Sequence, residues 1–374
     1  MSIKNLIMSS LSLLSGLSAN AFTTDSLTQM KGFPTTETGI EQGVSACFAG
    51  HIGAYIVMAG GCNFPVNTLA PDSKKKFYKG IYSARSTIGD QLTWTQIGSL
   101  PEPIAYGVAV SCADGMIIAG GQNESGSKHG VYRITLAKDG QARVTALPSM
   151  PCKVDNMAGA LVGRHLYIVG GMVDGKASNR VLCLDLDHLN RGWKDIQPFP
   201  GLPRVQPVAG SLGERKLCLF GGFAPATSEK EAQLAMDGYL FDEESGTWKN
   251  LDCPKDDTGE ALFVGGGAAI NIVDDHLLVT GGVNKDIFLS AVNHPQPDYL
   301  SHPIAWYQFN PYTLLYNEGG WQVLSKHTET ARAGAAMVKT DDGVFVIGGE
   351  LKPRVRSNQI IKYPEQAPHE REIK

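Results

Sequence analysis

The 374-residue sequence predicts an all-β fold, a six-bladed β-propeller, from three observations. A strand-like apolar run that ends in a Gly pair occurs six times, at residues 60–61, 120–121, 170–171, 221–222, 281–282 and 348–349. Successive pairs lie about 50–70 residues apart, a spacing that suits one small sheet per repeat. Around every pair the same kinds of strand recur in the same order. Small sheets repeated in this way pack around a central axis and leave only short, protected edges.

Each repeat is predicted to contain four short strands. The first is rich in small residues, as in NMAGALVGR (156–164), and the second ends at the Gly pair. The third often holds an aromatic residue, as in GYLFDEESG (238–246), and the fourth usually begins with a Trp; in the second repeat it is RVTALP (143–148) instead. Over residues 22 to about 365 this order resembles the kelch repeats of β-propellers. An unrelated β-sandwich with Gly-rich turns would not keep the order through six copies.

The two ends of the chain are expected to share one blade. The sixth repeat ends with SNQIIKYPEQ (357–366) and supplies only three strands. Near the N-terminus, LTQMKGFP (27–34) aligns with the fourth-strand segment WTQIGSLP (94–101) at Thr, Gln and the closing Pro. An N-terminal strand that completes the last blade would close the ring and remove exposed sheet edges. We therefore expect a single domain over residues 22–374.

The first 21 residues have the pattern of a secretory signal peptide. Lys4 is followed by an apolar stretch from Leu6 to Leu17 and by the small-residue site Ala19-Asn20-Ala21. We expect cleavage after Ala21 and a periplasmic or secreted protein. No later apolar run is long enough to span a bilayer, so no membrane segment is expected.

Composition excludes several classes of partner. The net charge is -4 and 43% of the residues are hydrophobic, which suits a large folded core. Nucleic acid binding needs a basic surface, so neither nucleic acid nor an anionic membrane is an expected partner. The seven cysteines lie far apart without a C-x-x-C motif, which favours buried single thiols over a disulfide framework or a zinc site. We expect no metal site, and the sequence does not indicate an oligomeric state.

The expected ligand site is the mouth of the central channel. In an antiparallel four-stranded blade, the loops that follow the Gly pairs share a face with the loops between blades. Both sets of loops line the channel mouth, where a rigid scaffold carries variable loops. The polar and aromatic candidates in these loops are Tyr106, Asp155, Arg204, Glu260, Asn284, Phe288, Arg332, Glu350 and Arg356.

Glu350 and Arg356 are the strongest of these candidates. Glu350 is the first residue after the Gly pair 348–349, so the preceding strand fixes its direction better than that of a residue in mid-loop. Arg356 stands close to the next strand and carries a planar guanidinium that suits a carboxylate. An internal ion pair that stiffens the loop and a role in ligand chemistry are equally compatible with the spacing.

Two loop segments, GGVNKDIF (281–288) and GGELKPRVRS (348–357), add a family resemblance. With the six repeats and the signal peptide, they resemble the bacterial N-acetylneuraminate epimerases, the sialic acid mutarotases. The family motif GE-x-KP-x-x-R is matched by Gly349, Glu350, Lys352, Pro353 and Arg356. In the better-known members this loop lies in mid-chain, so this chain resembles a circular permutant. The loop at residues 62–80 matches the family only in length and in its basic, aromatic character.

The resemblance implies an isomerase that interconverts the α and β anomers of N-acetylneuraminate without a cofactor. It assigns Glu350 as the catalytic base and Arg356 as the ligand of the sugar carboxylate. Further candidates for contacts to the substrate are Tyr106, Arg204, Asn284 and Arg332.

Three other functions compete with this one. A non-catalytic kelch propeller that binds a glycan or a protein shares almost every feature except the GE-x-KP-x-x-R match. A sialidase would carry Ser-x-Asp-x-Gly-x-Thr-Trp turns, and FDEESGTW (241–248) lacks the Ser-x-Asp. A copper oxidase of the kelch type would need clustered Tyr, His and Cys ligands, which the sequence does not bring together.

Overall fold

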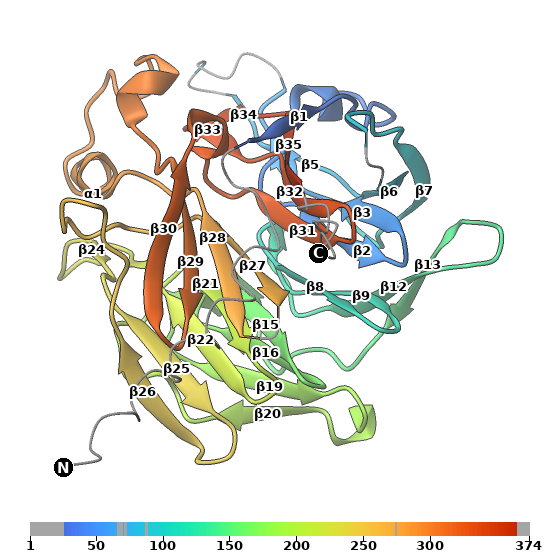
Figure 1. Cartoon of the computed structure of the whole chain (residues 1–374), viewed down its shortest axis with the longest axis horizontal. Coiled ribbons are helices and arrows are strands. Elements are labelled where there is room, and N and C mark those ends of the chain that lie inside the picture. The colour runs from blue at the N-terminus through green and yellow to red at the C-terminus, as the bar shows by residue number, and fades with distance from the viewer. Residues whose placement is uncertain (1–25, 66–69, 71–72, 87–88, 274, 365–374) are drawn as a thin grey trace, which may run out of the picture.

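A computed structural model describes residues 26–65, 70, 73–86, 89–273 and 275–364 (Figure 1). The predicted signal peptide, residues 1–21, lies outside the described residues, as does the C-terminal end from residue 365. The described chain is all-β, as predicted, with one α-helix, α1 (Lys285–Asn293), and four short 3-10 turns. No helix in this part of the chain is long and apolar enough to cross a membrane.

Six four-stranded antiparallel sheets form the frame of the described fold, and five smaller sheets of two or three strands accompany them. Each of the six begins with the small-residue strand and continues outward in chain order, except that β1 completes the last sheet. The sheets are β2 (Phe48–Ile52), β3 (Tyr55–Ala59), β6 (Gly80–Arg85), β7 (Thr95–Ser99); β8 (Val108–Cys112), β9 (Gly115–Ala119), β12 (Val131–Leu136), β13 (Ala142–Ala146); β15 (Ala158–Val162), β16 (His165–Val169), β19 (Val181–Asp185), β20 (Trp193–Ile196); β21 (Val208–Leu212), β22 (Lys216–Phe220), β25 (Gly238–Asp242), β26 (Thr247–Leu251); β27 (Ala268–Val273), β28 (His276–Thr280), β29 (Tyr312–Asn317), β30 (Gly320–Lys326); and β31 (Ala336–Thr340), β32 (Gly343–Ile347), β35 (Ile360–Pro364), β1 (Thr28–Met30).

The first strands of the six sheets face one another around the centre of the molecule (Figure 1). β2 contacts β8 and β31, and β15 contacts β8 and β21, while β27 contacts β21 and β31. Their small residues allow this close approach. A Cβ on Gly159 would lie 2.8 Å from Val108 Cγ1, and one on Gly50 would lie 2.6 Å from Ser111 Oγ. The hydrophobic core fills the layers between neighbouring sheets.

The N-terminal segment supplies the outermost strand of the last sheet. β1 pairs antiparallel with β35, with Thr28 opposite Lys362 and Met30 opposite Ile360. This is the pairing that the likeness of residues 27–34 to 94–101 predicts. It joins the first described strand to the last one and covers the edge of β35.

The Gly pairs bring each sheet against the next one. The second Gly of a pair donates its backbone N–H across the boundary, as Gly349 does to the Val44 carbonyl at 2.8 Å. The first Gly has a left-handed backbone, and a Cβ on Gly348 would lie 2.3 Å from the same carbonyl. Only glycine combines this left-handed backbone with so close an approach to the neighbouring carbonyl. The same bond runs from Gly61 to Ile104, from Gly121 to Val154, from Gly171 to Arg204 and from Gly282 to Arg332.

Gly348→Ala is therefore expected to destabilise the protein more than Gly53→Ala. Both glycines have left-handed backbones, with φ +64° and +56°, but a Cβ on Gly53 would meet no atom within 4 Å. The two substitutions share the cost of the backbone conformation, and only Gly348→Ala adds the collision with Val44, worth about 1–3 kcal/mol. Urea unfolding of both variants measures the difference. Equal losses would contradict this account of the Gly pairs.

Six residues between consecutive sheets form a closed circuit of backbone hydrogen bonds, here called the rim circuit. Each member donates its N–H to the carbonyl of the preceding member, and Ala46 donates to Gly334, at distances from 2.7 to 3.0 Å. All six have left-handed backbones, with φ between +52° and +72°. The members are Ala46, Tyr106, Asn156, Gln206, Gly266 and Gly334.

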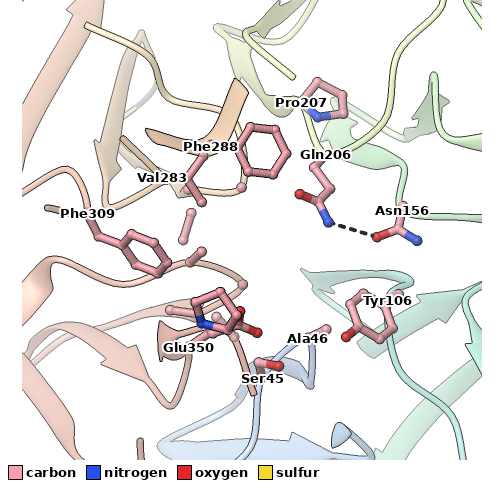
Figure 2. Close-up of a pocket in the computed structure, with 18 of the residues that line it drawn as sticks. Ser45, Ala46, Tyr106, Asn156, Gln206, Pro207, Val283, Phe288, Phe309 and Glu350 are labelled. Atoms are coloured by element: carbon pink, nitrogen blue, oxygen red, sulfur yellow. Dashed lines mark hydrogen bonds between the residues drawn. The ribbon is translucent and has the colours of Figure 1, made fainter. Parts of the chain in front are cut away.

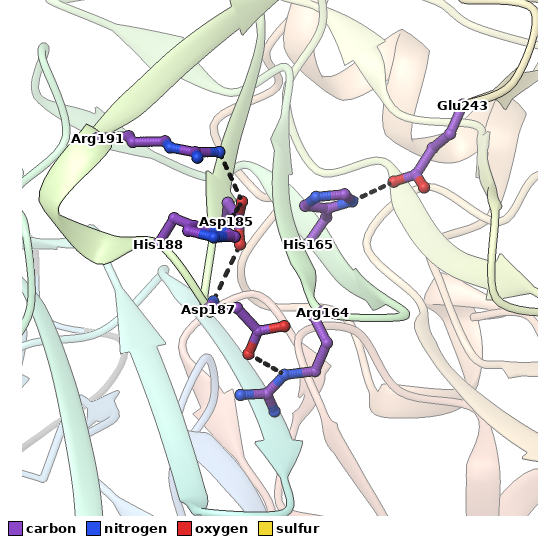
Figure 3. Close-up of polar contacts among 7 residues, drawn as sticks. All are labelled: Arg164, His165, Asp185, Asp187, His188, Arg191 and Glu243. Carbon is purple, nitrogen blue, oxygen red and sulfur yellow. Dashed lines mark hydrogen bonds and ion pairs between the residues drawn. The ribbon is translucent and has the colours of Figure 1, made fainter.

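Side chains at the opposite face connect three consecutive sheets (Figure 3). Arg164, in the turn before β16, donates to Asp187 at 3.0 Å and reaches Asp114 of the preceding sheet at 3.4 Å. His165 lies 2.8 Å from Glu243 of the following sheet. These groups are mostly solvated, so we assign them little of the stability.

All seven cysteines are free, and five of them are buried. They behave as small hydrophobic side chains, as the absence of a C-x-x-C motif predicts. Cys47 and Cys218 lie within the packed layers, where burial raises the pKa of each thiol to about 12. Both are therefore protonated and unreactive near neutral pH.

Candidate active site

A cavity of about 450 Å³ opens at the mouth of the central channel. All six members of the rim circuit line it, together with residues from the loops that follow β28 and β32. Its position is the one expected from the sequence, because both sets of loops emerge on this face. The volume lies within the range of about 300–1,000 Å³ that is usual for small-molecule sites.

One side of the cavity is apolar and the other is polar (Figure 2). Val283, Phe288 and Phe309 form the apolar side, and Phe288 is held by an edge-to-face contact with Phe223 at 4.8 Å between ring centroids. The polar side includes Ser45, Tyr106, Asn156, Gln206 and Glu350. Such a cavity suits a ligand with polar groups along one edge and an apolar group on the other.

The rim circuit is bulky on one half and small on the other. Tyr106, Asn156 and Gln206 are consecutive members, and Gln206 donates to Asn156 Oδ1 at 3.2 Å. The remaining members are Gly266, Gly334 and Ala46. Glu350 stands beside the small half, because its strand pairs with Ala333, next to Gly334. The open space of the cavity is therefore adjacent to the Glu350 carboxylate.

The backbone of Glu350 is fixed on both sides. Its N–H donates to the Ala333 carbonyl at 2.6 Å, and its carbonyl accepts from Ala333 N–H at 2.9 Å. It opens β33 (Glu350–Lys352), which pairs with β34 (Val355–Arg356). The side chain is 24% exposed, so it reaches the cavity from a largely buried position.

Arg356 forms an ion pair with Glu350 and is itself 4% exposed. Its guanidinium lies 5.5 Å from the centre of the Phe64 ring, and its Nε is buried without a hydrogen-bond partner. It borders a second cavity of about 220 Å³, which Asn63 and Phe64 also line, rather than the central one. The loop ion pair that the spacing allows is thus present. An unsatisfied buried donor costs free energy, and a ligand acceptor would recover that cost.

Lys75, which was not predicted from the sequence, lies next to Tyr106 in the same part of the site. Its Nζ donates to Tyr106 Oη at 2.8 Å and lies 4.5 Å from the centre of that ring. Burial lowers the pKa of Lys75, and Arg356 acts in the same direction while Glu350 opposes it. The run Lys74-Lys75-Lys76 was the available signal, but it stands in the one loop whose family match is weak.

Burial and the neighbouring cations shift the pKa of Glu350 in opposite directions. Burial raises the pKa of the Glu350 carboxyl above its ordinary value, and the cations Arg356 and Lys75 oppose that shift without cancelling it. A carboxylate with a raised pKa beside a cavity is a suitable proton acceptor.

Comparison with known proteins identifies the family. A model of the N-acetylneuraminate epimerase family matches residues 16–143 and 147–368, most of the chain. The chain belongs to the N-acetylneuraminate epimerase family. This membership confirms the resemblance carried by the two loop segments.

Individual relatives are more distant. An N-acetylneuraminate epimerase of Salmonella typhi is 29% identical over 231 residues, 58% of each chain. A Kelch domain-containing protein of Vibrio cholerae is 28% identical over 237 residues, 58% of this chain and 63% of the relative. The chain thus aligns with less than two thirds of the length of these relatives. A solved structure described as "Structure of YjhT" has a TM-score of 0.49 at 23% identity, covering 60% of this chain and 68% of the other. The circular permutation stays a prediction.

Within this N-acetylneuraminate epimerase family member, the motif residues after Glu350 have separate places. Lys352 is buried, and its Nζ donates to the carbonyls of Leu300 at 3.0 Å and His302 at 2.6 Å. It thereby ties the motif loop to the long loop of the preceding sheet. Pro353 lines the central cavity.

Asn284 lines the cavity but also caps a helix. Its Oδ1 accepts from the backbone N–H groups of Asp286 and Ile287 at 3.1 and 3.0 Å, so it is the N-cap of α1. Only its amide nitrogen remains to meet a ligand. The predicted candidates that the central cavity brings together are Tyr106, Asn284, Phe288 and Glu350.

Arg204 and Arg332 do not reach the central cavity. Both stand two residues before a rim-circuit member, where the other repeats have Val or Ile, and they are 0% and 1% exposed. Arg204 forms an ion pair with Asp237 at 2.5 Å, and Arg332 donates to the carbonyls of Gly348 and Gln359. Their positions correspond to core residues of the repeat, and we do not retain them as substrate contacts.

Two other polar candidates also have structural partners. Asp155 is buried and accepts from Ser127 and Asn156. Glu260 forms an ion pair with Lys285 at 2.9 Å and does not line the cavity.

Proposed function

We propose that this protein is a mutarotase that interconverts the α and β anomers of N-acetylneuraminate. The observation that carries the proposal is Glu350, a carboxylate with a raised pKa at the wall of the central cavity, in a member of the N-acetylneuraminate epimerase family. The family name of the relatives supports the substrate. The cavity supports a small molecule over a protein partner, because the loops enclose the site.

The proposed reaction needs only proton transfer. Glu350 removes the proton of the anomeric hydroxyl, and the bond between the anomeric carbon and the ring oxygen breaks. The ring oxygen takes a proton from a second donor, and the open-chain 2-keto acid forms. After rotation about the adjacent C–C bond, the ring closes on the other face of the carbonyl, and Glu350 returns its proton. Positioned acid–base groups contribute about 10²- to 10⁴-fold to such steps.

The substrate carboxylate is proposed to bind beside Glu350. Arg356 and Lys75 are the cations that act on the Glu350 carboxylate, and Arg356, which borders the neighbouring cavity, has an unsatisfied Nε. A carboxylate bound there takes over part of the ion pairing that Arg356 now gives Glu350. Glu350 is then freed to act as a base. The apolar side at Phe288 receives the methyl group of the acetamido substituent.

The test is anomer exchange followed by proton NMR with wild-type protein. We expect faster exchange of N-acetylneuraminate than in buffer, and no release of sugar from a fluorogenic sialoside. Exchange at the spontaneous rate would overturn the proposal and leave the non-catalytic kelch propeller. Release of the fluorophore would support the sialidase instead.

The same assay gives a pH dependence. Glu350 accepts a proton only when it is ionised, and its pKa is raised. Activity is therefore complete above that raised pKa and is lost as the pH falls through it, at a higher pH than for an exposed carboxylate. Values of kcat/KM between about pH 4 and pH 8 show this limb. A profile that is flat over the whole range would exclude Glu350 as the base.

The architecture and location follow as parts of the proposal. The six sheets are proposed to be the six blades of one ring, supported by the β1–β35 pairing and by the rim circuit. Export by cleavage after Ala21 places the enzyme in the periplasm or outside the cell. N-terminal sequencing of the mature protein tests this, and the expected first residue is Phe22.

A further inference from the structure

We propose that Tyr106 is the catalytic acid that protonates the ring oxygen, and that Lys75 is its positioning residue. The inference rests on the proposed mutarotase function and deepens it. It assigns a second proton-transfer group to a reaction for which Glu350 supplies only the first.

Ring opening moves two protons at two different oxygens. Glu350 takes the proton from the anomeric hydroxyl, whose oxygen becomes the ketone. The electron pair of the broken C–O bond remains on the ring oxygen, which takes a proton from Tyr106 Oη. The enzyme then holds a neutral Glu350 and a Tyr106 phenolate. Ring closure reverses both transfers, so protons and charge balance over the cycle. A single carboxyl would have to travel between the two oxygens within each turnover.

The backbone of Tyr106 is held in place at the cavity wall. Its N–H donates to the Ala46 carbonyl at 3.0 Å, and its carbonyl accepts from Asn156 N–H at 2.9 Å. Its φ is +63°, a conformation that costs free energy for a bulky residue and that persists where the surroundings enforce it. Tyr106 and Glu350 line the same cavity (Figure 2). Tyr106 is thus fixed at the wall of the cavity in which a bound sugar would lie.

Lys75 sets the direction in which Tyr106 donates. An ammonium group is only a donor, so the 2.8 Å hydrogen bond from Lys75 Nζ occupies a lone pair of the phenol oxygen. The hydroxyl hydrogen of Tyr106 is left to the Cys62 thiol, with which Tyr106 is hydrogen-bonded. The other titratable groups that face it are Arg356, Glu350 and Cys62. A thiol is a weak acceptor, so a ring oxygen in the cavity is a better partner for this hydrogen.

The charges around Tyr106 suit an acid that is regenerated in each turnover. Burial raises the pKa of Tyr106 well above its ordinary value, so the phenol is protonated near neutral pH. When it gives up its proton, the cations Lys75 and Arg356 stabilise the phenolate. These two residues come from separate loops, residues 62–80 and 350–358, and meet at the phenol.

The experiment compares Tyr106→Phe, Lys75→Met and Lys75→Arg by NMR anomer exchange of N-acetylneuraminate. Tyr106→Phe keeps the ring and removes the acid, so we expect kcat to fall by about 10²-fold or more with a smaller change in KM. Lys75→Met is expected to lower kcat less than Tyr106→Phe does. Lys75→Arg is expected to keep most of the wild-type kcat, because it keeps a donor and a charge. Tyr55→Phe, at a 41% exposed tyrosine, is the matched control and keeps wild-type values.

Two results with the variants overturn the inference. The first is Tyr106→Phe with the wild-type kcat. The second is a Lys75→Met defect confined to KM, or one that Lys75→Arg does not rescue, which would make Lys75 a binding residue only. If Glu350→Gln abolishes exchange while Tyr106→Phe does not, the mutarotase function stands and this inference fails. If the wild-type protein does not accelerate exchange, both fail together. Thermal unfolding and N-acetylneuraminate binding of each variant exclude misfolding as the cause of a loss.

Discussion

Glu350→Gln is expected to lower the rate of anomer exchange by about 10²- to 10⁴-fold at neutral pH. The amide keeps the size of the side chain and the backbone bonds to Ala333, but it cannot accept the anomeric proton. The variant should also lose the acid limb of the pH profile, because the group that titrates is gone. Exchange spectroscopy on mixed anomers measures both effects.

The variant should still fold and bind the sugar. Removing the Glu350 charge leaves Arg356 buried and unpaired, so we expect a modest loss of stability and tighter binding of the substrate carboxylate. Glu260→Gln is the matched control, because Glu260 was also expected at the channel mouth but does not line the cavity. Wild-type exchange by Glu350→Gln would remove the basis of the mutarotase proposal.

The second large effect concerns stability. Asp237→Asn is expected to lower the free energy of unfolding by about 3 kcal/mol at neutral pH, near the lower end for a broken buried ion pair because Asp237 is 39% exposed. Arg204 is fully buried against the rings of Phe199 and Tyr239, and it would lose its anionic partner. Urea unfolding measures the change.

The pH dependence of this pair has a defined sign. Burial opposes ionisation of Asp237, but the hydrogen bonds and charge of Arg204 outweigh it and hold the pKa of Asp237 below its ordinary value. Its contribution to stability is therefore present above the unfolded-state pKa and is lost as the pH falls through the folded-state pKa. The difference between wild type and Asp237→Asn should shrink in acid. Asp187→Asn, at the solvated pair with Arg164, should change stability little at any pH. Similar losses in the two variants would show that burial of Arg204 is not what matters.

Repeats made the strands and the position of Glu350 predictable, while its role as base came from the family resemblance. The Gly pair fixes where each second strand ends, and so it placed Glu350 at the channel mouth without any knowledge of its contacts. The likeness of residues 27–34 to 94–101 was enough to place β1 beside β35. These features depend on backbone geometry that every copy shares.

Features found in one repeat only were not predictable in the same way. The helix α1 lies inside a loop, although its Asn284 N-cap and the apolar residues Ile287 and Phe288 were visible signals. Arg204 and Arg332 were misjudged because charged residues were expected to face the channel. Aligning the six repeats would have shown both at a core position that Val or Ile fills elsewhere. Lys75 meets Tyr106 across 31 positions of sequence, a contact that spacing alone does not reveal.

The rim circuit has a consequence for how such a protein acquires new specificity. Its six peptide groups all point the same way round, so their dipoles cancel and no donor or acceptor is left over. The number of residues in the rim circuit therefore sets the width of the channel mouth, independently of which side chains those residues carry. Substitutions at these six positions can then reshape what enters the channel while the frame keeps its circumference. Selection for a different sugar acid can act on Tyr106, Asn156 and Gln206 with little risk to folding elsewhere.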